Sequence, residues 1–340
     1  MGAPAKGNRA PARGNRAPAE DNRAPAKDDR ALAEDDRAPA KTNGAQAEDS
    51  SARAKGSKAP AGNGASTKLD PAPAKAKPAP AEHNRAPGTG NRAPAGLDWE
   101  WATTTGGALT GRQRRQLTGK LVTALPGIVA GQVRLAFGRR GTGRVDFTDL
   151  RLPDSRLARA AETEARERLT PHVLEHSYRS YFFGRALAEL DGVRYDDELA
   201  YVSCLLHDLN LEHPTPGRCF AVTGAERAVA FAEAAGATPE QAHTIGAAIA
   251  AHLTIGIADR PDDLGFVSAG AGVDVLGLRM ADLAPDWVAE LLHRHPRHDF
   301  KRHMIAALRA EAAVVPDGRA RWLLSTAQFA PLIRLAPFPE

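Results

Sequence analysis

The pair His207 and Asp208 ends an apolar segment, residues 199–206, whose sequence is LAYVSCLL. Apolar neighbours make an unpaired charge costly, so these two side chains need a strong partner inside the protein. A metal ion is the simplest single partner for a base and an acid together. The pattern therefore indicates metal ligation, provided that further ligands come from other parts of the chain.

Two further candidate ligands are His176, upstream of the pair, and Asp274, downstream of it. His176 shares a predicted helical face with Phe183, Leu187 and Leu190, and Asp274 stands between two valines in an apolar turn. Taken singly, the first could be a core histidine and the second a helix cap. Together, two imidazoles and two carboxylates form the mixed ligand set that suits zinc, iron or manganese with an open coordination position.

His252 is a further candidate because it follows Ile245 and Ile249 on the inward stripe of its predicted helix. A second His-Asp pair, His298 and Asp299, has polar neighbours and is expected to be an exposed turn in which Asp299 caps a helix. Six further histidines are expected to be structural or solvent-facing: His172, His213, His243, His293, His295 and His303.

Capping residues predict where the helices that carry these side chains begin. The expected starts are Asp154, Thr170-Pro171, Asp196 or Asp197, the capping boxes Thr223–Glu226 and Thr238–Gln241, Asp286 and Asp299. Residues 110–137 predict one or two short helices, and residues 145–152 predict a short strand or an extended arm. No segment after Pro153 alternates as a sheet strand does, so the predicted fold class is all-α.

Composition divides the 340 residues into three predicted regions. Residues 1–96 form a degenerate seven-residue repeat rich in Ala, Pro and Arg. Because proline recurs once per period and apolar residues are scarce, this tail is predicted to be disordered rather than a coiled coil. Residues 97–153 are predicted to be an N-terminal extension with short helices, and residues 154–340 a metal-binding domain.

Charge and apolar patterning exclude several classes of protein. The tail holds 17 basic and 11 acidic residues, whereas residues 97–340 hold 28 and 30, so the foldable part is not a basic nucleic-acid-binding domain. Cys204 and Cys219 are too few for a disulfide framework. No uninterrupted apolar stretch predicts a signal peptide or a membrane span, so a cytoplasmic protein without a membrane partner is expected. The sequence does not determine the oligomeric state.

The order His176, His207-Asp208, Asp274 on consecutive helices resembles the HD-domain superfamily of metal-dependent hydrolases. The blocks EHSYRSYFFG from Glu175, CLLHDL from Cys204, AIAAH from Ala248 and GVDVLG from Gly272 resemble its cyanamide-hydratase-like branch. The resemblance spans about residues 155–335. It implies an all-helical HD fold in which His176, His207, Asp208 and Asp274 hold the metal, with His252 nearby as a substrate contact or second-metal ligand. The segment LNLEH after Asp208 departs from the branch, which bears on the substrate.

These residues predict an enzyme that activates a metal-bound water, because a divalent ion lowers the pKa of water towards about 7. Asp208 would accept a proton, and His252 would pass one to the substrate, a small molecule with a nitrile- or amide-like group. A phosphohydrolase acting on a nucleotide or phosphate ester is the alternative, with Arg179 as the available cation. A non-catalytic helical module stabilised by a metal is the third possibility.

Overall fold

The computed structural model describes Gly2 and residues 96–148, 151–256 and 260–340. The chain divides into two units, residues 1–79 and 80–340, and all the described residues except Gly2 belong to the second unit. The predicted tail therefore lies outside the described residues, apart from Gly2 and Gly96.

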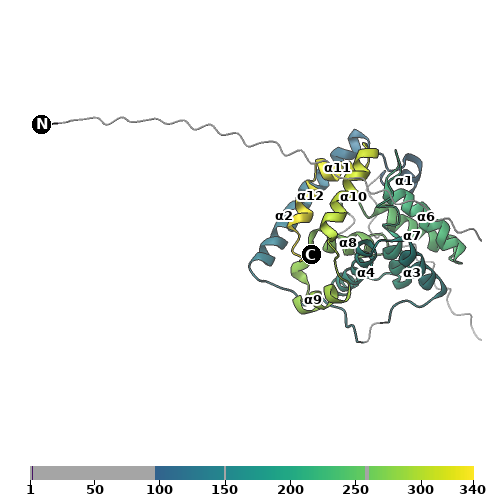
Figure 1. Ribbon diagram of the computed structural model, residues 1–340, viewed down its shortest axis with the longest axis horizontal. Coiled ribbons are helices and arrows are strands. Elements are labelled where there is room, and N and C mark those ends of the chain that lie inside the picture. Colours follow the sequence, from purple (N-terminus) through teal and green to yellow (C-terminus); the bar gives the residue numbers. More distant parts are fainter. Residues whose placement is uncertain (1, 3–95, 149–150, 257–259) are drawn as a thin grey trace, which may run out of the picture. The chain divides into compact units, whose positions relative to one another are not determined.

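The described part of the chain is built from helices, which confirms the all-α prediction (Figure 1). The α-helices are α1 (Trp99–Thr105), α2 (Gly111–Ala136), α3 (Arg156–Arg168), α4 (Pro171–Asp191), α5 (Asp197–Leu206), α6 (Phe220–Ala234), α7 (Pro239–Ala251), α8 (Phe266–Leu276), α9 (Pro285–Arg294), α10 (Phe300–Val314), α11 (Arg319–Ser325) and α12 (Phe329–Leu335). A 3₁₀-helix covers Met280–Asp282. Within the described ranges there is no strand, and two isolated bridges join Gly143 to Leu283 and Thr215 to Arg218.

Helices α4 and α8 pack closely along one another at the centre of the fold (Figure 1). Gly270 of α8 lies against the backbone of α4, and a Cβ atom there would come within 1.9 Å of the Ser180 carbonyl oxygen. Gly184 of α4 lies against the ring of Phe266 in the same way. Only glycine allows such an approach. The close contact brings His176 of α4 next to Asp274 of α8.

The predicted starts of the central helices are confirmed. α4 begins with Thr170 at its N-cap and Pro171 in its first turn, and it ends at Gly192, whose φ is +60°. The Asp196 carboxylate accepts a hydrogen bond from the Leu199 amide at the start of α5. Thr238 and Gln241 form the predicted capping box of α7. These starts are determined by residues within one turn of the helix end, which is why the sequence predicts them.

The predicted capping box at Thr223–Glu226 is wrong. Helix α6 already begins at Phe220, and the Thr223 hydroxyl donates to the Phe220 carbonyl within the helix. The Phe220 amide instead donates to Oε1 of Glu311, at 2.8 Å. The N-terminal amide of α6 is thus satisfied by a side chain from α10, which local sequence does not reveal.

Several other boundaries also differ from the predictions. α2 is a single helix of 26 residues, longer than the one or two short helices predicted there, with Pro126 inside it. α3 is capped by Ser155, one residue after the predicted Asp154, and α9 by Ala284 rather than Asp286. Asp299 stands at the N-cap of α10 as predicted, but its side chain makes no capping hydrogen bond. None of the described helices combines the length and apolar character needed to cross a membrane.

Candidate metal centre

Three side chains from α4 and the end of α5 converge in the core. The Nε2 atoms of His176 and His207 are 3.3 Å apart. Oδ2 of Asp208 lies 3.2 Å from Nε2 of His207 and 3.7 Å from Nε2 of His176. All three ligand atoms lie within 4.8 Å of one another. All three residues are buried, so bulk water does not solvate the group. The structure thus brings together three of the four predicted ligands.

The second nitrogen of each imidazole faces a hydrogen-bond acceptor. Nδ1 of His176 lies 2.7 Å from Oδ2 of Asp274, and Nδ1 of His207 lies 2.7 Å from the Cys204 carbonyl oxygen. Nδ1 of His252 lies 2.6 Å from the Ile249 carbonyl oxygen. An acceptor at Nδ1 holds the proton of a neutral imidazole there, which leaves Nε2 as a lone pair. The Nε2 lone pairs of His176 and His207 then face each other and a carboxylate.

This arrangement fits a divalent cation. Ligand atoms bound at about 2.1 Å to one ion in tetrahedral or octahedral geometry are about 3.0–3.5 Å apart. The separations of 3.2 to 3.7 Å among His176, His207 and Asp208 agree with that range to within a few tenths of an ångström. Converging lone pairs also require a positive charge between them. The buried group of His176, His207 and Asp208 could therefore hold a metal ion.

Without an ion, the pKa values of these side chains show that the Asp208 carboxylate is stabilised by positive charge on the neighbouring histidines. Burial lowers the pKa of His207, but the Asp208 carboxylate outweighs burial, and the pKa of His207 is raised overall. Burial raises the pKa of Asp208, yet the neighbouring histidines hold this pKa well below its ordinary value. Burial lowers the pKa of His176, and burial together with the charge of His207 lowers the pKa of His252 to about 3.

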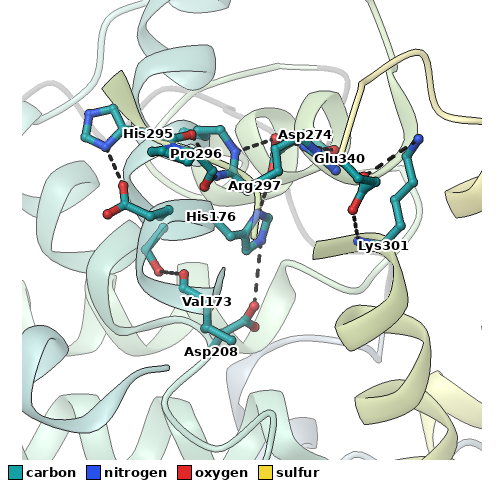
Figure 2. A network of polar contacts seen from close by, with 12 residues as sticks. Val173, His176, Asp208, Asp274, His295, Pro296, Arg297, Lys301 and Glu340 are labelled. Carbon is teal, nitrogen blue, oxygen red and sulfur yellow. Dashed lines mark hydrogen bonds and ion pairs between the residues drawn. The ribbon is translucent and has the colours of Figure 1, made fainter. Parts of the chain in front are cut away.

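Asp274 does not join this group, although the sequence predicted it as a ligand. It lies inside α8 on the Nδ1 side of His176, where a buried network surrounds its carboxylate (Figure 2). Oδ1 accepts hydrogen bonds from Nε of Arg179 at 2.8 Å and from Nη1 of Arg297 at 2.7 Å. Oδ2 accepts one from Nη2 of Arg179 at 3.0 Å, besides facing His176. Both carboxylate oxygens are therefore engaged away from the candidate metal position.

The charge of Asp274 is stabilised by these partners. Burial raises the pKa of its carboxyl group, but the guanidinium groups of Arg179 and Arg297 and the bond to His176 hold the pKa far below its ordinary value. An ionised carboxylate behind a metal-binding histidine fixes the orientation of the ring and increases the basicity of its other nitrogen. The geometry thus assigns Asp274 the position of an orienting group for His176.

The sequence does not predict that Arg297 binds Asp274, because Arg297 stands among the polar neighbours of His298. The Arg297 side chain is 2 % exposed, and its guanidinium group also packs on the rings of Phe300 and Phe338. Nε of Arg297 donates to the Glu340 carboxylate, which also accepts from the backbone amide of Lys301 (Figure 2). No periodic pattern marks Arg297 as buried. His298 and Asp299 beside it are exposed, as predicted.

Two histidines that were expected to be structural or solvent-facing are paired with acids. Nε2 of His172 lies 3.0 Å from Glu212, and its ring stacks on His303 with centroids 4.0 Å apart. Nδ1 of His295 lies 2.7 Å from Glu175. These pairs lie outside the group of His176, His207 and Asp208.

The candidate ligands form part of the wall of a cavity of about 120 Å³. His252 also lines the cavity, and its Nε2 lies 3.7 Å from Oδ1 of Asp208. The rest of the wall is mainly apolar and comes from α6, α8, α10, α11, α12 and the residues that follow α7 and α8: Phe220, Leu253, Thr254, Ile255, Ser268, Ala271, Gly272, Val275, Leu276, Leu278, Met304, Leu308, Leu323 and Phe329. No lysine or arginine is among these described residues.

Arg319, which contacts Thr254 of the described wall, is directed into the backbone at the end of α7. Arg319 is fully buried, and its Nη1 donates to the Ala250 carbonyl oxygen and to the Thr254 hydroxyl. These bonds hold the C-terminal end of α7, immediately before His252. Arg319 was not singled out in the sequence, and it contributes to the position of His252 rather than to binding in the cavity.

No protein-family model matches this chain, and none of the curated proteins matches it.

Proposed function

We propose that this protein is a metal-dependent hydrolase or hydratase of the HD type that acts on a small, uncharged substrate with a nitrile- or amide-like group. The observation that supports the proposal is that His176, His207 and Asp208 border a largely apolar cavity. Metal ligands that face a cavity leave a coordination position for water or substrate, which is the arrangement of catalytic sites.

The charge of the cavity wall favours an uncharged substrate over a phosphate ester. Phosphate oxygens in enzyme sites are normally bound by arginine or lysine side chains. The described wall has neither, and Arg179, the cation that the sequence offered for this purpose, is fully buried and bound to Asp274. The phosphohydrolase alternative therefore lacks the cation on which it depended.

The position of Asp274 argues against a purely structural metal. Structural sites are usually closed by four protein ligands. Here Asp274 is engaged by Arg179 and Arg297, so three protein ligands face the cavity. A helical module whose metal serves only stability would need a fourth ligand in place of Asp274, and His252, which the proposal uses for proton transfer, is the candidate that also lines the cavity.

A divalent ion held by these residues would lower the pKa of water enough to supply hydroxide as the nucleophile at neutral pH, and it would polarise the substrate. Asp208 is the nearest acceptor for the proton that the water loses. Nε2 of His252, 3.7 Å from Oδ1 of Asp208, is placed to receive that proton and to deliver it to the nitrogen of the substrate. The apolar wall excludes bulk water and orients the rest of the substrate.

The size of the cavity restricts the substrate. A cavity of about 120 Å³ is comparable with the ~150 Å³ engineered cavity that admits benzene, so substrates of about six heavy atoms fit. The membership of the HD superfamily and the cytoplasmic location are parts of the same proposal, supported by the spacing of the site residues and by the composition of the chain.

The proposal is tested by two substrate panels on protein loaded with zinc, iron or manganese. We expect turnover of small aliphatic nitriles or amides and none of nucleotides or phosphate monoesters, with activity lost on chelation and restored by the metal. Turnover confined to the phosphate panel would establish the phosphohydrolase. A stoichiometric metal that exchanges no ligand with water would identify a structural site.

A further inference from the structure

A row of large apolar side chains lies exposed along helix α2. It consists of Val122, Leu125, Val129, Val133 and Phe137, and these residues are called the apolar stripe. Their exposed fractions range from 43 % to 80 %. They recur at intervals of three or four residues and so share one side of the helix. Of the nine exposed large apolar side chains in the described residues, five belong to this stripe.

The opposite side of α2 is attached to the rest of the protein. Leu117 is fully buried in a small core with Trp322 and Leu323. Nη1 of Arg134 pairs with Asp282 at 2.8 Å. Because these contacts hold α2 by its other faces, the apolar stripe points away from the core. An exposed apolar row of this kind marks an interaction site rather than a loosely packed core helix.

The charged residues of α2 and of the segments that flank it in the sequence are all basic. Residues 121–133 contain no charged side chain, and no acidic residue occurs between Glu100 and Asp146. Exposed arginines stand at both ends of the stripe: Arg112 and Arg115 before it, and Arg139, Arg140 and Arg144 after it. Arg115 precedes Val122 by two helical turns and therefore lies on the same face.

These charges decide which partner fits. Pairing α2 with α2 of a second copy would place basic ends against basic ends in either direction. The chain's own tail is not complementary either, since residues 3–95 have only Leu32 and Leu69 as large apolar side chains and carry a net positive charge. An anionic lipid surface offers both an apolar layer for the stripe and negative headgroups for the arginines.

We propose that the apolar stripe of α2 docks peripherally on an anionic membrane surface, with the arginines at both ends against lipid headgroups. The stripe runs over 16 residues, from Val122 to Phe137, and is about 22 Å long, so the helix would lie along the surface. The proposal replaces the expectation of a protein without a membrane partner, and it does not depend on the proposed catalytic activity. It agrees with the absence of a membrane-crossing helix among the described residues.

The test is co-sedimentation of the full-length protein with vesicles. We expect binding to vesicles of 70 % phosphatidylcholine and 30 % phosphatidylserine, weaker binding at high salt, and little binding to pure phosphatidylcholine. Val129→Glu, in the middle of the stripe, should reduce the partition coefficient by about tenfold or more. Leu335→Glu is the matched control, because Leu335 is 78 % exposed on α12 and lies outside the stripe. It should leave binding unchanged.

Three results would overturn the proposal. Unchanged binding of the Val129→Glu protein would show that the basic tail alone attaches the chain to lipid. Self-association that Val129→Glu abolishes, without vesicle binding by the wild type, would assign the stripe to a second copy. A wild type that is monomeric and binds no vesicle would indicate instead that the stripe binds an acidic protein partner. Circular dichroism of each variant establishes that the helical fold is retained.

Discussion

The Nδ1 atom of His176 lies 2.7 Å from Oδ2 of Asp274, on the side of the imidazole ring opposite His207 and Asp208. Two arginines, Arg179 and Arg297, bind the same carboxylate. The relationship makes Asp274 a residue that orients His176, a candidate metal ligand. Its mutation should therefore weaken metal binding without abolishing it.

Asp274→Asn tests this role directly. The amide keeps the shape of the side chain but leaves the buried guanidinium group of Arg179 without a counter-charge, and it leaves Arg297 with Glu340 alone. We expect metal affinity to fall about 10–100-fold and the free energy of unfolding to fall by about 3–5 kcal/mol. Isothermal titration with zinc and urea unfolding measure the two effects. Complete loss of metal with unchanged stability would instead make Asp274 a ligand.

His207→Ala and Asp208→Ala should each remove the bound metal, because two protein ligands rarely retain a divalent ion. Elemental analysis of protein purified without added metal measures the loss. The chain offers a matched control in the second His-Asp pair, since His298→Ala and Asp299→Ala alter an exposed turn. Those two variants should keep full metal content. Retention of metal and activity in the His207 or Asp208 variants would refute the site.

Met304→Ala should enlarge the cavity, because Met304 lies in its wall. We expect the ratio of kcat/KM for larger over smaller uncharged substrates to rise, with a stability cost of about 2–5 kcal/mol. Ile305→Ala is the control, since Ile305 is equally buried on the same helix but does not line the cavity. It should reduce stability without changing the preference. Equal selectivity of both variants would show that the cavity is not the substrate site.

Removal of the metal should lower thermal stability as well as activity. An ion that binds only the folded state stabilises it by about 4 kcal/mol when present at a thousand times its dissociation constant. Without the ion, the positive charge that stabilises the Asp208 carboxylate comes from the neighbouring histidines, chiefly His207. We expect chelation to lower Tm, and stoichiometric zinc, iron or manganese to restore it. An unchanged Tm would show that the group binds no ion tightly.

Deletion of residues 1–95 should leave folding and metal content intact, since the tail has almost no large apolar side chains. The truncation keeps Gly96, whose carbonyl oxygen accepts a hydrogen bond from Gln113, and Leu97, which is buried. Circular dichroism and elemental analysis measure the result. Loss of the folded core on this deletion would contradict the assignment of the tail.

Much of the fold was predictable because its signals are local. Thr170, Pro171 and Gly192 delimit α4, and the capping box at Thr238 and Gln241 starts α7. Errors arose where the stabilising group comes from a distant part of the chain. The α6 N-terminus depends on Glu311, which is 91 residues from Phe220, and no local pattern carries that information.

The sequence by itself determined the all-α class and the candidate ligands His207 and Asp208. The helix before this pair is apolar throughout, which indicates that the helix and the two ionisable residues at its end are buried. Only the tertiary structure decided the position of Asp274 and the composition of the cavity wall. Asp274 meets Arg179 across 95 residues, a contact that depends on how α4 packs on α8. It meets Arg297 across 23 residues, a contact that depends on where the connection between α9 and α10 lies. Helical periodicity specifies which face of a helix is buried, whereas the partner of a buried charge is chosen by packing in three dimensions.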